Sequence, residues 1–145
     1  QSLNYPALLE IELPNAQGTK YLALSSIKGD TGVFGSVDKI EMPLSIINSI
    51  WTRKAIVLWK DFENLPESFD LGFKGKEAVW LQKNLRLLGY FQGREAPLYG
   101  PKTIRAVRRF QRNNNIKDDG KFQVDSKMLV YNLLQIYPTP ELVIQ

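Results

Sequence analysis

A half-repeat in residues 76–134 constrains this chain more than any other feature. The stretch Val79 to Gln82 returns as Val107 to Gln111, and both stretches end with a large apolar residue followed by glutamine. Each copy belongs to a stripe of apolar residues at helical spacing and runs into a turn with glycine, Gly89 in the first copy and Gly120 in the second. We expect two related helix–turn units to pack together as one small domain.

The spacing predicts three helices in the second half of the chain. The first begins after Gly75 and ends at Gly89, because glycine is favoured just past a helix end. The second begins near Pro101, since proline suits the first turn of a helix. A third helix closes the domain, and the residues expected to face inward from the second and third are Ile104, Val107, Phe110, Leu129, Leu133 and Leu134.

The first half of the chain reads mainly as β structure. Residues 6–13 and 21–27 flank a turn with proline, asparagine and glycine, which predicts a hairpin. A third strand is expected within 33–37, a short helix over 43–51 and a buried strand over 55–59. The chain as a whole is therefore predicted to be of the α+β class.

Proline, glycine and polar residues between positions 64 and 72 interrupt the periodic segments and predict a domain boundary. We expect a β-rich region over 1–65, a short linker over 66–74, a helical domain over 75–137 and an extended tail over 138–145.

The composition excludes several kinds of chemistry. The chain has no cysteine and no histidine, which removes disulfides, a thiol nucleophile, thiolate metal sites and the commonest general base. We expect no catalytic residues, no metal and no cofactor. No apolar run is long enough to cross a membrane, and the start of the sequence lacks the pattern of an export signal.

The second half resembles the peptidoglycan-binding domain of the three-helix type. That family's pattern is V-x-x-L-Q, L-x-x-L-G-Y, D-G-x-F-G-x-x-T, A-V-x-x-F-Q and a closing D-G. The matching stretches here are 79–82, 85–90, 98–103, 106–111 and 119–120. The departures are Ala96-Pro97 in place of the first Asp-Gly, and Gln123 and Ser126 in place of the second unit's Gly and Thr. The first turn must therefore be rebuilt around proline, and the second helix start is weaker.

The first half resembles the C-terminal part of a papain-like double-glycine peptidase, in the degenerate form that precedes a peptidoglycan-binding domain in ExeA/GspA proteins. Those proteins are inner-membrane ATPases of type II secretion. Lys20 stands where an active member has its histidine, and Asp38 is near the third catalytic position. Because a thiol protease needs a thiolate activated by an adjacent base, the resemblance implies an inactive peptidase-like region.

Together the two resemblances imply noncatalytic binding to peptidoglycan by the periplasmic portion of a bacterial inner-membrane protein, which would anchor it for secretin assembly. They also imply an ATPase domain upstream and an ExeB/GspB-like inner-membrane partner, and self-association into a homo-oligomer is compatible with them. The first alternative is a protein–protein scaffold module that does not bind the wall directly, and after it comes a three-helix module that binds nucleic acid.

The family resemblance implies a shallow groove between the turn after the first helix and the start of the second. Aromatic faces there would stack on the ligand, while Arg and Lys would pair with stem-peptide carboxylates. The candidate residues are Tyr90, Gln92, Arg94, Tyr99, Lys102 and Arg105. Both tyrosines have a structural alternative, since aromatics beside glycine turns often close small cores. Gln82 and Gln111 are expected to be buried amides that bind turn backbone.

Charge leaves a second class of partner open. Residues 1–70 hold six Lys or Arg against nine Asp or Glu, a net charge of −3, whereas residues 71–145 hold thirteen against six, a net charge of +7. The basic half suits an anionic polymer, although a solvated surface explains it as well. Arg105, Arg108, Arg109 and Arg112 form a stripe that could contact nucleic acid. No base-reading set accompanies the stripe, so no nucleic-acid partner is expected.

Overall fold

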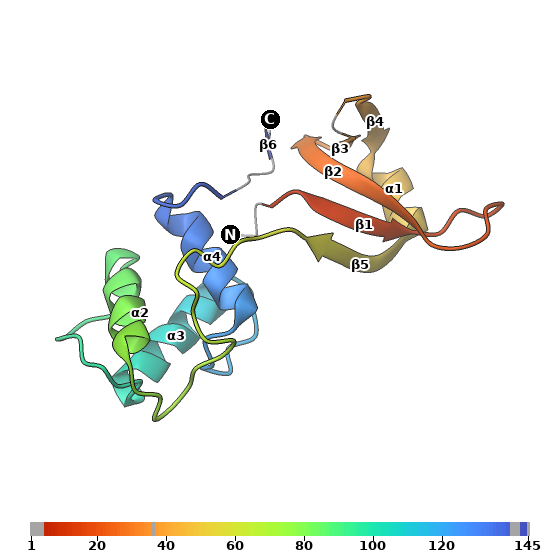
Figure 1. Cartoon of the computed structure of the whole chain (residues 1–145). Coiled ribbons are helices and arrows are strands. Elements are labelled where there is room, and N and C mark those ends of the chain that lie inside the picture. The colour runs from red at the N-terminus through yellow and green to blue at the C-terminus, as the bar shows by residue number, and fades with distance from the viewer. Residues whose placement is uncertain (1–4, 36, 140–142, 145) are drawn as a thin grey trace. The chain divides into compact units, whose positions relative to one another are not determined.

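The computed structural model describes residues 5–35, 37–139 and 143–144. These residues divide into two compact parts. The first, which we call the β-rich unit, comprises the described residues up to Trp59 together with 143–144. The second, which we call the helical unit, comprises residues 60–139. The predicted α+β class is confirmed (Figure 1).

The β-rich unit is a mostly antiparallel sheet with one short helix. Its strands lie in the order β4-β3-β2-β1-β5, and β6 pairs in parallel with β2. The elements are β1 (Ala7–Ile11), β2 (Lys20–Lys28), β3 (Thr31–Phe34), β4 (Ile40–Pro43), α1 (Leu44–Ile50), β5 (Trp51–Val57) and β6 (Val143–Ile144). The expected hairpin is present as β1 and β2 with Leu9 opposite Leu22. Strand β4 was not predicted, because its four residues end in a proline that reads as a break.

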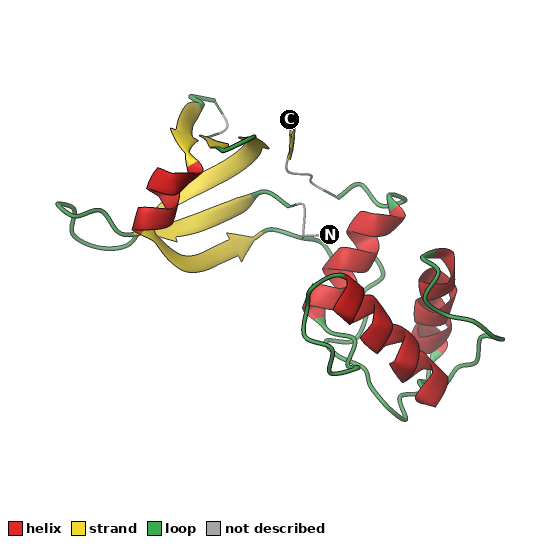
Figure 2. Cartoon of the chain, turned by 180° about the vertical axis from the view of Figure 1, so that it is seen from behind, coloured by secondary structure: helices red, strands yellow, loops and turns green. Residues whose placement is uncertain are grey.

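Helix α1 covers one face of this sheet (Figure 2). Its buried residue Ile47 packs in one cluster with Leu9 of β1 and Phe34 of β3. The alternation of β1 explains this burial: Leu9 and Ile11 point to the core, and Leu8 and Glu10 are less buried.

The helical unit contains α2 (Lys76–Leu87), α3 (Pro101–Asn113) and α4 (Val124–Leu134). Helix α2 contacts both α3 and α4 (Figure 1). The apolar stripes meet in a closed core, whose most buried members include Leu81, Leu85, Val107, Phe110 and Leu129. None of the helices among the described residues has both the length and the apolar composition that a membrane crossing requires.

The half-repeat is held together by a buried glutamine in each copy. Gln82 Nε2 donates to the Leu98 carbonyl oxygen (2.9 Å) and to the Thr103 hydroxyl (2.9 Å). Its Oε1 accepts from the N–H of Ala96 (2.7 Å). One side chain therefore fixes the turn before α3 to the first turn of α3, as expected for a buried amide that binds turn backbone.

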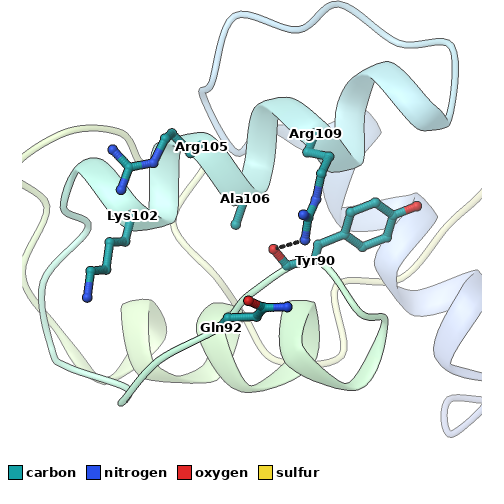
Figure 3. A pocket seen from close by; sticks show the side chains of 6 residues that line it. All are labelled: Tyr90, Gln92, Lys102, Arg105, Ala106 and Arg109. Carbon is teal, nitrogen blue, oxygen red and sulfur yellow. Dashed lines mark hydrogen bonds between the residues drawn. The ribbon is translucent and has the colours of Figure 1, made fainter.

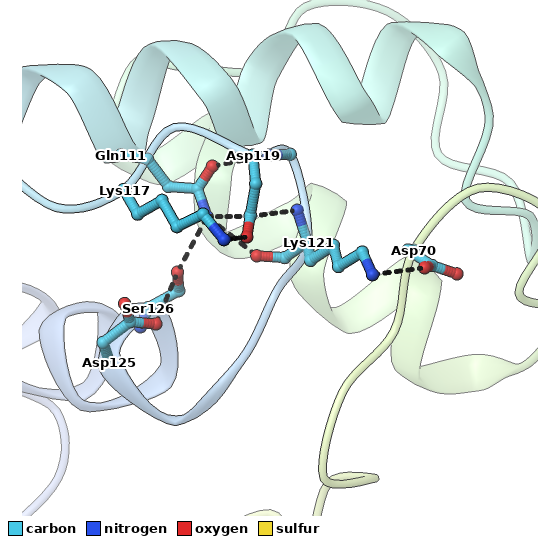
Figure 4. Close-up of polar contacts among 8 residues, drawn as sticks. Asp70, Gln111, Lys117, Asp119, Lys121, Asp125 and Ser126 are labelled. Carbon is cyan, nitrogen blue, oxygen red and sulfur yellow. Dashed lines mark hydrogen bonds and ion pairs between the residues drawn. The ribbon is translucent and has the colours of Figure 1, made fainter.

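Gln111 repeats this arrangement in the second copy (Figure 4). Its Nε2 donates to the Lys121 carbonyl oxygen (2.7 Å), and its Oε1 accepts from the N–H of Gly120 (2.9 Å). The position equivalent to Gly120 in the first copy is Pro97, which has no N–H, and Ala96 supplies the donor instead. This is how the first turn is rebuilt around proline.

The segment before α2 is part of the helical unit, and this corrects the expected linker over 66–74. Phe69 is buried, and its ring lies 5.2 Å from that of Phe122 and 6.0 Å from that of Tyr99. The N–H of Phe69 donates to the Phe122 carbonyl oxygen (3.1 Å), and the N–H of Phe122 donates to the Phe69 carbonyl oxygen (2.9 Å). The sequence predicted a linker here because proline, glycine and polar residues are visible in it. The burial of the Phe69 ring depends on contacts that form only in the fold.

The residues before this segment are also anchored on the helical unit. Lys127 of α4 is buried, and its Nζ lies 3.6 Å from the Asp61 carboxylate and donates to the Leu65 carbonyl oxygen (3.4 Å). The boundary therefore falls near residue 60, not after 65. At the other end of the chain, the expected tail over 138–145 includes β6, while 140–142 and 145 lie outside the described residues.

Candidate binding groove

A groove of about 360 Å³ lies between the turn after α2 and one face of α3 (Figure 3). Lys102, Arg105 and Arg109 come from successive turns of α3, at the spacing that places side chains on one face of a helix. The residues that line the groove are Tyr90, Gln92, Lys102, Arg105, Ala106 and Arg109.

Two of these cations are free to meet a ligand. Within the described residues, neither Lys102 nor Arg105 has a hydrogen bond or ion pair to another side chain, and both are exposed. No carboxylate of the described residues lines the groove, and the first turn of α3 has no acidic residue. A recess with positive charges and no internal counter-charge attracts anions.

Arg109 has a different role, because its guanidinium is engaged by the neighbouring turn. It donates to the carbonyl oxygens of Gly89 (2.9 Å) and Tyr90 (2.6 Å), and it lies 5.7 Å from the centre of the Tyr90 ring. Gly89 has a positive φ of 80° at the end of α2, where glycine avoids a Cβ penalty. Arg109 thus binds the carbonyls of a turn that forms one wall of the groove.

Arg86 of α2 holds the same turn from its other side. It forms an ion pair with Glu95 (2.6 Å), donates to the carbonyl oxygen of Gly93 and lies 5.9 Å from the centre of the Phe91 ring. Charge-assisted hydrogen bonds of this kind are stronger than neutral ones. The two arginines therefore preorganise the turn before any ligand binds, which lowers the entropy lost on binding.

A second hollow of about 420 Å³ adjoins the groove and shares Lys102 and Arg105 with it. Arg94 also lies here, exposed and, within the described residues, without a side-chain partner. The remaining lining residues are Gln82, Phe91, Ala96, Leu98, Gly100, Pro101 and Thr103.

The structure brings together most of the predicted site residues. Tyr90, Gln92, Lys102 and Arg105 line the groove, and Arg94 lines the adjoining hollow. Tyr90 is half-buried, with its ring edge-on to Phe110 at 5.2 Å, and in Figure 3 its hydroxyl points away from Lys102.

Tyr99 does not belong to the groove, and this prediction is corrected. It is fully buried, and its hydroxyl donates to the Gly120 carbonyl oxygen at 2.7 Å. Burial, and after it the carboxylates of Asp70 and Asp119, raises the pKa of this phenol above its ordinary value. Tyr99 is therefore a core residue that joins the two turns, which is the structural alternative that the sequence left open.

Sequence reasoning missed Ala106 and Arg109 as groove residues. Arg109 was assigned to the outward stripe of α3, although it lies seven positions after Lys102 and so shares its face. Of the other stripe residues, Arg112 is paired with Asp118 at 3.0 Å. Arg109 and Arg112 thus have partners within the protein, and the stripe is less available to an external polyanion than its sequence suggests.

No group of three or more acidic side chains in the described ranges is placed to hold a metal ion. What the geometry provides is a rigid wall, unpaired cations and two adjoining recesses. This combination suits noncovalent binding of an anionic ligand.

The groove thus lies within a small helical unit. Residues 74–124 match the family model described as a putative peptidoglycan binding domain. The resemblance recognised in the sequence is confirmed for this segment.

Two solved structures are similar to the chain over most of its length. One is a periplasmic domain of the EpsAB fusion protein of the Vibrio vulnificus type II secretion system, 18% identical, with 96% of this chain and 70% of that chain covered and a TM-score of 0.48. The other is a peptidoglycan-binding protein from Clostridioides difficile in complex with glutamine hydroxamate, 20% identical, with 84% and 66% covered and a TM-score of 0.44. Comparison with curated proteins gave no significant match.

Proposed function

We propose that the chain binds peptidoglycan noncatalytically through the groove between the turn after α2 and the N-terminal half of α3. One observation carries the proposal: within the segment that matches the peptidoglycan-binding family, Lys102 and Arg105 line a preformed groove and are unpaired in the described residues. The carboxylates of the wall polymer's stem peptides are suitable partners, because Arg and Lys bind carboxylates through charge-assisted hydrogen bonds.

The proposed setting is the periplasmic portion of a type II secretion assembly ATPase of the ExeA/GspA kind. Binding to the wall would hold such a protein where a secretin is assembled, beside an ExeB/GspB-like inner-membrane partner and with the option of self-association. Support for this setting is the order of the two units, a β-rich unit followed by a peptidoglycan-binding domain, which is the order of the resemblance.

The β-rich unit is proposed to be peptidase-like and inactive. Lys20 opens β2 at the position where the resemblance expects histidine, Asp38 is exposed in the turn before β4, and the sequence has no cysteine. A lysine without a thiol cannot form the nucleophile and base pair of a thiol protease.

A second candidate function is protein binding by the β-rich unit, and one observation favours it. A hollow of about 270 Å³ on this unit is lined almost entirely by apolar residues, among them Leu8, Ile56 and Leu58. Ile56 and Leu58 are 48% and 71% exposed, and exposed apolar side chains that cluster mark interaction surfaces. Scaffolding through this hollow is compatible with wall binding by the other unit.

The test is cosedimentation of the chain with insoluble peptidoglycan sacculi at low and at physiological salt. The groove variant is Lys102→Gln with Arg105→Gln. The matched control is Lys76→Gln with Lys83→Gln, which removes the same charge from exposed positions on α2 outside both hollows. Retention at physiological salt that the groove variant loses and the control keeps supports the proposal. Equal losses for both variants would mean general electrostatic adhesion, and no retention of the unaltered chain would refute wall binding.

A further inference from the structure

The groove and the adjoining hollow differ in chemistry although they share two residues. The groove presents polar side chains, among them Gln92 and Arg109. The adjoining hollow presents Phe91, Ala96 and Leu98 as well as the cations. Lys102 and Arg105 line both recesses, so the groove and the hollow share these two positive charges.

Apart from the three cations, the polar side chains that line the hollow, Gln82 and Thr103, are already bonded within the protein. The Gln82 amide nitrogen donates one hydrogen bond to the Leu98 carbonyl oxygen and one to the Thr103 hydroxyl, which uses both of its hydrogens. The Gln82 amide oxygen accepts from the N–H of Ala96. A sugar bound there could accept hydrogen bonds from the cations, but among the lining side chains its own hydroxyl hydrogens would meet only the Gln82 and Thr103 oxygens, which already accept hydrogen bonds within the protein.

Among its described lining residues, the hollow also has no open aromatic face on which a sugar ring could stack. Phe91 is 4% exposed, and the Arg86 guanidinium lies 5.9 Å from its ring centre. Leu98, at 42% exposed, is a large accessible apolar side chain of the lining, and the smaller Ala96 and Pro101 are exposed beside it. An aliphatic group fits these surroundings, and a carbohydrate does not.

The charges specify what accompanies the aliphatic group. Arg94, Lys102 and Arg105 contribute three positive charges around the hollow, and its lining in the described part of the chain includes no acidic residue. Arg and Lys in such a recess select a carboxylate, which Arg can bind in bidentate fashion.

We propose that this hollow is a subsite for the peptide part of the wall polymer: a small apolar side chain lies against Leu98 while the neighbouring carboxylate is held by Lys102 and Arg105. The inference rests on the proposed function and deepens it, since it assigns recognition to peptide and not to glycan. The groove, which shares Lys102 and Arg105 with the hollow, would then accommodate the rest of the bound peptide.

The first arm of the test compares two forms of the polymer with the full 145-residue chain. One is intact sacculi, and the other is glycan strands from which an amidase has removed the peptides. Binding to sacculi with at least about tenfold weaker binding to the glycan strands is the expected result. Equal binding to both would overturn the inference and leave the proposed function standing, whereas binding to neither would refute the proposed function.

The second arm tests the apolar contact. Leu98→Gln is expected to weaken binding to sacculi about tenfold, and Leu98→Met to keep it, because only the glutamine places a polar group against the ligand's apolar side chain. The matched control is Leu87→Gln, an exposed leucine on α2 that lines neither recess. Thermal unfolding of each variant establishes that it is folded. Unchanged binding by a folded Leu98→Gln variant would overturn the subsite.

A soluble probe completes the test. Acetyl-Ala-Ala with a free carboxylate is titrated into the labelled chain and followed by amide NMR shifts, beside the same dipeptide with an amidated end. Shifts at Leu98 and Lys102 that only the free carboxylate causes are expected. Equal shifts with the amidated peptide would show that the cations do not select a carboxylate, contrary to the inference.

Discussion

Replacing Gln82 with methionine tests whether one buried amide organises the turn that forms the groove. Methionine has similar length and is apolar, so the packing is kept while three hydrogen bonds are lost, those to Leu98, Thr103 and Ala96. At a net value of about 1 kcal/mol each, the helical unit should lose about 3 kcal/mol of unfolding free energy. For a unit of this size the midpoint of thermal unfolding should fall by roughly 10–25 °C.

The assay is thermal and urea unfolding of the helical unit followed by circular dichroism. Gln111→Met should cause a loss of similar size, because Gln111 binds the second turn as Gln82 binds the first. Gln92→Met is the matched control, since Gln92 is exposed and has no side-chain partner in the described part of the chain, and its effect should stay within about 0.5 kcal/mol. If Gln82→Met were as mild as this control, the proposed role of the buried amides would be wrong.

Three further predictions concern other parts of the helical unit. Arg109→Gln should weaken sacculus binding roughly tenfold, or about 1.4 kcal/mol, and speed amide exchange at Tyr90, whereas Arg112→Gln should do neither. Phe69→Ala should cost about 3–5 kcal/mol in urea unfolding, and a loss below about 0.5 kcal/mol would restore the linker assignment. Burial, and then a hydrogen bond to Glu63, raises the pKa of Tyr137 from 10.0 to about 12. The stability that the Tyr137 phenol contributes is therefore complete below pH 10 and lost as the pH rises toward 12. Over that range the urea midpoint of Tyr137→Phe should fall less than the midpoint of the unaltered chain.

The repeat was predictable from sequence because its signals are local. Helical spacing, Gly89 and Pro101 specify where α2 ends and α3 begins, and the recurrence of glutamine at 82 and 111 indicates equivalent positions. The hairpin of β1 and β2 follows from alternation and a turn in the same way. These features depend on neighbours within a few residues, which a single sequence displays.

What escaped prediction depends on contacts distant in sequence. Tyr90 and Tyr99 both lie beside a glycine, yet one lines the groove and the other is core, because Tyr99 reaches Gly120 in the second turn. Arg109 looks like any exposed helix arginine until the turn carrying Gly89 folds against it. Phe69 likewise acquires its partners only when the second turn is in place.

The departures from the family pattern were informative about structure. Ala96-Pro97 stands where the family pattern has Asp-Gly, and this replacement predicted that the first turn would be rebuilt around proline. The structure shows the solution, a hydrogen bond from Ala96 to the same glutamine oxygen. The sequence predicted that the first turn differs from the family pattern. It did not show that the N–H of Ala96 is the substitute donor, because this depends on the path of the backbone.

Amide NMR titration of the full chain with soluble peptidoglycan fragments tests the account's central claim most directly, because it reports where a wall ligand binds. The account predicts that shift changes concentrate in residues 89–98 and in the N-terminal half of α3, including Lys102 and Arg105. Shift changes confined to the outer arginines of α3 or to the β-rich unit, or none at saturating fragment, would contradict it.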